Sequence, residues 1–245
     1  MVMILVYGSD GTGKSIQTKS IAEMSDSAIV LSFATKNRKL YESSGVECIE
    51  LLRFNDDANV NPYKTMDEFQ NQCNKIVKEN TVKLVVIDEI TLLRKWAQPV
   101  ILEEINRSRR GTDKPLLTKI GENNYAAWES VNKLVYGALE RLANWAVIND
   151  VTIIAITSMV EERKLVQDDD GKSKSITTGK WVADAKLNVR KLADVIIGLE
   201  KDGVKGKGYH AFFIKTQDWM KEGPDFCKLD KQGLMTELMK RGVLE

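Results

Sequence analysis

The chain has 245 residues and a formal net charge of +1, which predicts one globular domain over residues 1–245 with no general attraction to nucleic acid. No apolar run approaches the roughly 20 residues that span a bilayer, and the three cysteines are far apart, so we expect no membrane segment, no secretion and a cytoplasmic location with reduced thiols. The single histidine, His210, argues against a zinc site with several imidazoles and against a Ser–His–Asp hydrolase.

The N-terminal segment predicts a buried strand over 3–7 and a helix over 16–24, joined by a loop that matches G-x-x-x-x-G-K-[S/T]. In that loop the glycines let backbone N–H groups point at a polyphosphate, and the helix N-terminus adds the positive end of its dipole. Lys14 would reach the β- and γ-phosphates, and the Ser15 hydroxyl would bind Mg²⁺. The expected ATP site consists of Gly8, Ser9, Asp10, Gly11, Thr12, Gly13, Lys14, Ser15 and Ile16.

Further along, apolar strands alternate with helices, which predicts a parallel sheet with helices on its faces. We expect strands at 28–33, 46–54, 83–89 and 151–158, and helices at 65–80 and 124–148. Thr65 or Asp67 would lie near the start of the first of these helices. The second carries one apolar face, formed by Trp128, Val131, Val135, Leu139, Leu142 and Trp145, which is typical of core packing.

Between these helices, residues 92–121 are polar, with a helical start and an exposed turn at 111–115. The charged stretch 162–181 contains a hairpin turn at 168–172. Strands at 195–199 and 209–214 predict antiparallel strands added at the C-terminal side of the sheet, and a short helix is expected at 231–241.

The strand at 83–89 ends in two acids at the carboxyl edge of the sheet, where ligands bind in open α/β folds. Asp88 is expected to bind Mg²⁺ together with Ser15. Glu89 would orient and deprotonate the attacking water, with Glu47 and Glu50 as alternative catalytic acids on a neighbouring strand.

Two hydroxyls, Thr157 and Ser158, end the strand that should lie beside the Asp88 strand. A hydroxyl there could contact the γ-phosphate or the attacking water. The alternative is a simple cap for the next element.

With both motifs in place, the chain resembles RecA-like P-loop ATPases. More narrowly, it resembles the phage-encoded nucleotide-binding proteins of replication and recombination gene clusters, which are related to Sak-type single-strand annealing ATPases. The likeness is carried by 8–15, 87–89, the helix containing Trp128, the strand ending at Thr157 and Ser158, and the late strand 212–215.

The resemblance implies an α/β, RecA-like P-loop NTPase fold and a homo-oligomeric ATPase stimulated by single-stranded DNA. For a phage protein it implies the host cytoplasm, with other replication or recombination proteins as partners. It also implies that Lys215 acts on the γ-phosphate of the neighbouring protomer, whereas the alternative is a lysine that protects a sheet edge.

Contact with DNA would come from loops at the carboxyl edge of the sheet, for which the basic segments 107–110 and 163–180 are the candidates, with Trp181 stacking on a base. The alternative is that these segments are simply solvated. Two other functions remain open. One is a nucleotide kinase that closes an arginine-rich lid, and the other is a regulatory nucleotide switch that binds a protein partner.

Overall fold

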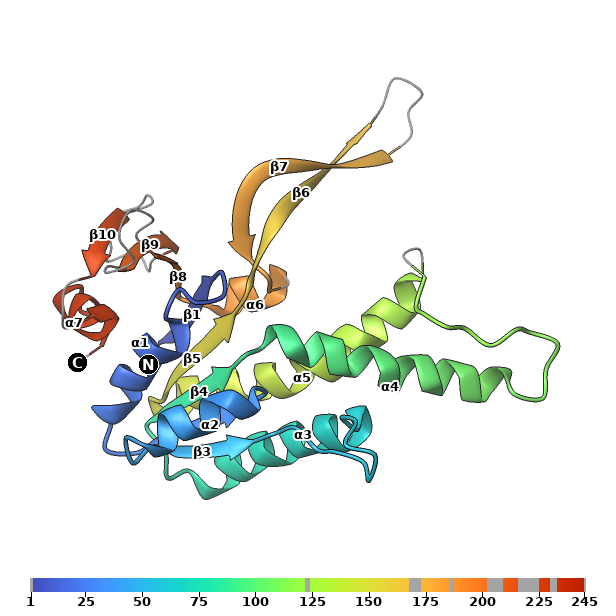
Figure 1. Cartoon of the computed structure of the whole chain (residues 1–245), viewed down its shortest axis with the longest axis horizontal. Helices are drawn as coiled ribbons and strands as arrows, with labels where there is room; N and C mark the ends of the chain where they lie inside the picture. The colour runs from blue at the N-terminus through green and yellow to red at the C-terminus, as the bar shows by residue number, and fades with distance from the viewer. Residues whose placement is uncertain are drawn as a thin grey trace.

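The computed structural model describes residues 2–121, 124–167, 173–185, 187–201, 209–215, 225–229 and 233–244 (Figure 1). The strands are β1 (Met3–Gly8), β2 (Ala28–Ser32), β3 (Glu47–Glu50), β4 (Leu84–Asp88), β5 (Thr152–Thr157), β6 (Met159–Gln167), β7 (Ser173–Ala183), β8 (Val195–Lys201), β9 (Tyr209–Lys215) and β10 (Asp225–Leu229). The helices are α1 (Lys14–Glu23), α2 (Thr35–Glu42), α3 (Pro62–Glu79), α4 (Thr91–Arg109), α5 (Tyr125–Asn149), α6 (Leu187–Leu192) and α7 (Gly233–Lys240).

The central sheet has eight strands in the order β10-β9-β8-β1-β5-β4-β2-β3. All pairs from β8 to β3 are parallel, and β9 and β10 add antiparallel strands at the C-terminal side. This confirms the predicted α/β fold with a mostly parallel central sheet. The strand that carries the phosphate loop, β1, is separated from β4 by β5, so the loop and the two acids face each other across one strand.

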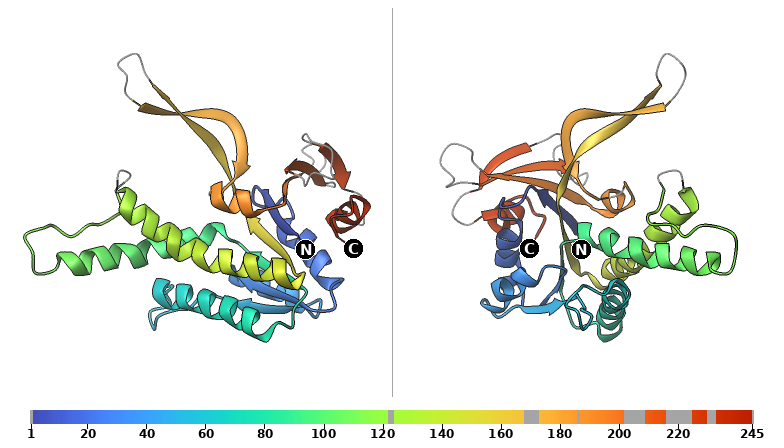
Figure 2. Two further views of the ribbon diagram at one scale, coloured as in Figure 1. Left: turned by 180° about the vertical axis from the view of Figure 1, so that it is seen from behind. Right: turned by 45° about the vertical axis from the view of Figure 1, so that its right-hand side comes forward.

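Both faces of the sheet are covered by helices, as the near-continuous apolar strands require. Along β1, Met3, Leu5 and Tyr7 join a core with α3, α4 and α5, whereas Ile4 and Val6 join a second core with α1 and α7. Figure 2 shows these two groups of helices on opposite sides of the sheet. Polar chemistry is therefore left to the edge of the sheet where the strands end.

Several element boundaries differ from the prediction. The third strand ends at Glu50, and α3 begins at Pro62 because Asn61 caps it: the Asn61 side chain accepts a hydrogen bond from the Lys64 N–H. Thr65, which was expected near the helix start, is instead buried and accepts a hydrogen bond from the Arg53 N–H.

The short helix α2 and the strand β10 were not predicted. In α2 only Tyr41 is buried, so the segment carries no apolar stripe that could reveal a helix. The helix prediction for 231–241 is confirmed by α7 where the structure describes that segment.

Two pairs of elements project from the sheet in Figure 1. The helices α4 and α5 run side by side away from the strand ends, and β6 and β7 form a separate antiparallel ribbon that pairs from Met159–Ala183 to Gln167–Ser173. The hairpin turn expected at 168–172 lies outside the described residues. None of the helices in the described part of the chain has the length and apolar character to cross a bilayer.

The core facing α5 offers a test of the packing. Leu142 is fully buried, whereas Ile148, on the same helix, is 83% exposed. Leu142→Ala should lower the free energy of unfolding by about 2–5 kcal/mol, since the mutation leaves a cavity. Ile148→Ala should change it by no more than about 0.5 kcal/mol. Urea unfolding followed by circular dichroism measures both, and equal losses would contradict this account of the core.

Candidate active site at the carboxyl edge of the sheet

The loop between β1 and α1 has the backbone shape of a phosphate-binding loop. Gly11 and Gly13 have φ angles of 78° and 81°, which favour glycine because other residues are strained there. Gly13 precedes α1 directly, so the first-turn N–H groups of the helix, which have no partner within the helix, point into the loop. Asp10 and Ile16 lie on the exposed side of this turn. The arrangement can receive an anion.

Gly8 is needed for a different reason, because the loop packs closely against β8. A Cβ at this position would lie 2.5 Å from the Leu199 carbonyl oxygen and 2.6 Å from the Thr12 hydroxyl. The Thr12 hydroxyl is itself held, since it donates to the Ser9 carbonyl at 2.8 Å. A side chain at Gly8 would therefore displace the loop.

Lys14 is buried at the centre of the loop, with 8% of its surface exposed. Its Nζ donates to the carbonyl oxygens of Gly8 at 2.8 Å and Ser9 at 3.0 Å. The loop thus wraps around its own cation. A bound phosphate would exchange these neutral acceptors for charged ones, which make stronger hydrogen bonds.

The two expected metal ligands come together beside Lys14. Asp88, which is 1% exposed, ends β4. Asn37 joins it to Ser15: the Asn37 Nδ2 donates to Asp88 Oδ2 at 2.9 Å and lies 3.3 Å from Ser15 Oγ. A hydroxyl and a carboxylate oxygen that converge in this way fit Mg²⁺, which prefers oxygen ligands and keeps several waters.

The Asp88 carboxyl is strongly affected by its surroundings. Burial raises its pKa above the usual value, while hydrogen bonds from Tyr41, Ser15 and Asn37 lower it and the charge of Glu89 raises it. The Tyr41 hydroxyl donates to Asp88 Oδ2 at 3.1 Å. Burial of the Tyr41 hydroxyl raises its pKa, and the negative charge of Asp88 raises it further. The phenol therefore keeps its proton and remains a hydrogen-bond donor.

Glu89 directly follows Asp88 and is held from β5. The Ser158 hydroxyl donates to Glu89 Oε1. The Ser158 N–H donates to the Thr91 hydroxyl at 3.0 Å, and that hydroxyl lies 2.7 Å from the Thr157 hydroxyl. The carboxylate is therefore oriented by a chain of hydroxyls at the ends of β4 and β5.

The other predicted residues lie in different places. Thr157 is fully buried and its hydroxyl also donates to the Asp184 carbonyl at 2.9 Å, so it is part of this internal chain. Glu50 is level with Asp88 but two strand spacings away, about 10 Å. Glu47 is exposed at the far end of β3. Lys215 is the last residue of β9.

Sequence reasoning did not identify Asn37, Tyr41 or Thr91. The first two lie on α2, a polar helix in which only Tyr41 is buried, and Thr91 is an ordinary helix-start residue. Their polar atoms matter because of where the strands bring them. Only the spacing of Thr91 from Asp88 could have drawn attention to it.

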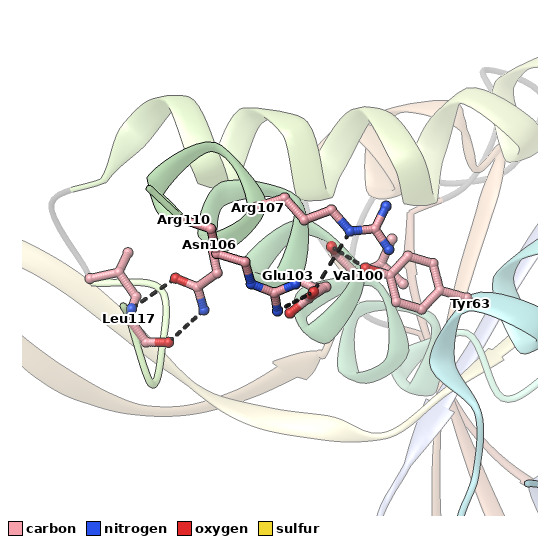
Figure 3. A network of polar contacts seen from close by, with 7 residues as sticks. All are labelled: Tyr63, Val100, Glu103, Asn106, Arg107, Arg110 and Leu117. Carbon is pink, nitrogen blue, oxygen red and sulfur yellow. Dashed lines mark hydrogen bonds and ion pairs between the residues drawn. The ribbon is translucent and has the colours of Figure 1, made fainter. Parts of the chain in front are cut away.

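The basic segment 107–110 forms the end of α4 and its C-cap and is not a loop beside the strand ends (Figure 1), and Figure 3 shows Arg107 and Arg110 around Glu103. With 19 residues, α4 carries these arginines about 28 Å from its start. Glu103 contacts Arg110 at 2.8 Å and Arg107 at 3.6 Å, and Arg109 donates to the Pro115 carbonyl. The charge of this cluster is thus partly neutralised. Trp181, on β7, is 56% exposed.

The geometry defines a P-loop protein with a phosphate-binding loop facing a pair of acids. A family model described as "AAA domain" matches residues 1–224, and the chain belongs to this family of ATPase domains. A comparison with curated protein sequences found no match.

Solved structures with similar folds include a KaiC-like protein from the archaeon Pyrococcus horikoshii OT3, at 15% identity and a TM-score of 0.45, covering 94% of this chain and 85% of that one. Another is an ATPase from the type III secretion system of pathogenic bacteria, at 16% identity and a TM-score of 0.44, covering 81% of this chain and 52% of that one. At these scores the assignment rests on the family model and on the geometry of the site.

Because the pKa of Asp88 is raised, replacing its carboxylate by a neutral group should stabilise the protein. In Mg²⁺-free buffer with EDTA, Asp88→Asn should raise Tm at pH 7, because the amide oxygen can still accept both hydrogen bonds without a buried charge. When folding raises the pKa of an acid, the protein is most stable below the pKa of that acid in the unfolded state, about 3.9. Its free energy of unfolding then falls as the pH rises through the pKa of the folded state. The gain should therefore disappear below about pH 4.

Asp57 provides the matched control. It is exposed, and hydrogen bonds from the Asn59 side chain and backbone lower its pKa. Asp57→Asn should not raise Tm at pH 7. A Tm for Asp88→Asn at or below that of the wild type at pH 7 would show that the carboxylate is not penalised by burial.

Proposed function

We propose that this protein is a Mg²⁺-dependent ATPase that hydrolyses ATP to ADP. We further propose that it acts in phage DNA replication or recombination and is stimulated by single-stranded DNA. The observation that carries the ATPase proposal is the convergence of Ser15 and the buried Asp88 on Asn37, directly beside Lys14 in its loop.

Each residue in the site has a role in this reaction. Lys14 leaves the Gly8 and Ser9 carbonyls to bind the phosphates, and Ser15 with Asp88 would hold the metal, which neutralises phosphate charge when bound. Water attacks the γ-phosphorus and the bond to the ADP oxygen breaks. Glu89, oriented by Ser158, accepts the proton of that water.

The finer parts of the proposal have separate support. The DNA and phage roles rest on the family resemblance and on the basic segment 107–110. We also propose that the protein is a homo-oligomer in which Lys215 contacts the γ-phosphate of the neighbouring protomer, and that the whole chain is one domain. Thr157 would contribute through its hydrogen bond to Thr91 and not by touching the nucleotide.

A nucleotide kinase or a nucleotide switch would use the same phosphate loop, so a measurement of ATP hydrolysis is needed to distinguish them from an ATPase. Glu89→Gln should bind ATP normally and reduce its hydrolysis by about 10²–10⁴-fold, since the amide cannot accept the proton. Lys14→Ala should instead lose ATP affinity. Phosphate release and calorimetry measure the two effects, with Glu50→Gln as the control that keeps turnover. Full hydrolysis by Glu89→Gln together with loss in Glu50→Gln would assign catalysis to Glu50.

The DNA part has its own test. Changing Arg107, Arg109 and Arg110 together to glutamine should weaken binding of an oligo-dT and flatten its dependence on salt by up to about 2 in the log–log slope. The control is the same change at the exposed Lys64, Lys75 and Lys78 of α3. If the slopes of the two triple variants agree, the arginines at the end of α4 do not contact DNA.

A further inference from the structure

A polar cavity lies next to the turn that follows Asp88 and Glu89, where Ile90 and Thr91 line it. It has a volume of about 500 Å³ and is lined by residues at the start of α4, by Tyr136 of α5 and by Asp184, Ala185 and Arg190. A volume of this size accommodates a small ligand or one nucleotide unit. Of the residues that line it, only Thr91 also takes part in the hydrogen-bond chain that orients Glu89.

The charged side chains that line this cavity are mostly positive. Arg94, Lys95 and Arg190 line it together with a single acid, Asp184. Thr91 and Gln98 add a hydroxyl and an amide. Three cations on adjoining walls repel one another, and this repulsion is relieved when an anion binds between them.

Arg94 supplies the second observation. Its Nε is buried, yet among the described residues nothing accepts a hydrogen bond from it. A buried donor of this kind is costly to leave unsatisfied. The guanidinium is also held in place, because its carbon lies 4.7 Å from the centre of the Trp128 ring. The Arg94 side chain, which lines the cavity, is thus held in place beside Trp128.

Arg190, on α6, lines the same cavity. Its Nη2 donates to the Ala183 carbonyl at 2.6 Å, which anchors the side chain where β7 ends. Two arginines fixed on different elements suit a phosphate group, since guanidinium N–H groups match phosphate oxygens in pairs. A carboxylate partner is less suited to three cations than a phosphate, which offers more oxygens and more charge.

We propose that this cavity is a second, phosphate-binding site, in which Arg94, Lys95 and Arg190 hold the phosphate of a small anion or of a nucleic-acid backbone. It is separate from the phosphate loop and does not depend on ATP binding there. The phosphate chemistry is common to both sources, and the probe distinguishes them.

The test uses the full chain with its phosphate loop filled by ADP and Mg²⁺. Orthophosphate and the oligonucleotide dT6 are titrated by calorimetry into the wild type, Arg94→Gln, Lys95→Gln and the control Lys78→Gln, which removes an exposed charge on α3. At least one probe should bind to the wild type and to the control. It should bind about tenfold more weakly to the two cavity variants, which lose a charged hydrogen-bond donor.

Binding of orthophosphate alone assigns a small-anion site, and binding of dT6 assigns a nucleic-acid backbone. If neither probe binds to the wild type, or if both cavity variants stay within about threefold of the control, the proposal is overturned. Lys95 is exposed, so Lys95→Gln should fold normally. If Arg94→Gln does not fold, the binding measured for Lys95→Gln tests the proposal. ADP affinity, measured in the same proteins and in Lys14→Ala, reports separately on the phosphate loop.

Discussion

The buried carboxylate of Asp88 is the constraint around which this site is organised. Removing a charged group from water is costly unless hydrogen bonds replace the lost solvent. Two donors from α2, Asn37 and Tyr41, provide them, and Asn37 also contacts Ser15 on α1. The requirement to satisfy one acid therefore brings the ends of β4, α1 and α2 together, and so creates the pair of oxygens that suits a metal.

The parallel register of the sheet explains why the hydroxyls gather next to that acid. In the sheet Asp88 is level with Ile156, and Tyr7 is level with Thr157. The residues that follow β1, β4 and β5 therefore leave the sheet at one edge, which brings Lys14, Glu89 and Ser158 within a small region.

The fold and the phosphate loop could be predicted from sequence because their signals are local. The glycine spacing, the apolar strands and the pair Asp88-Glu89 each appear within a few residues of chain, and the predicted alternation was confirmed. The role of Asn37 and Tyr41 could not be predicted, because α2 is exposed and has one buried residue. Its function depends on a contact between residues 51 positions apart. The arginines of 107–110 were expected at the strand ends because nothing local indicates that α4 continues unbroken, past the internal Pro99, to Arg109.

The proposed ATP site and the proposed second anion site meet at the turn from Asp88 to Thr91. This turn carries Asp88, the proposed metal ligand, and Glu89. Thr91, at its end, lines the positive cavity. The Thr91 hydroxyl accepts from the Ser158 N–H, and the Ser158 hydroxyl holds Glu89. A ligand that shifts Thr91 would therefore act, through one hydrogen bond, on Ser158, the residue that orients Glu89. In this way the packing that satisfies buried polar groups also gives the cavity a short physical connection to the proposed chemistry.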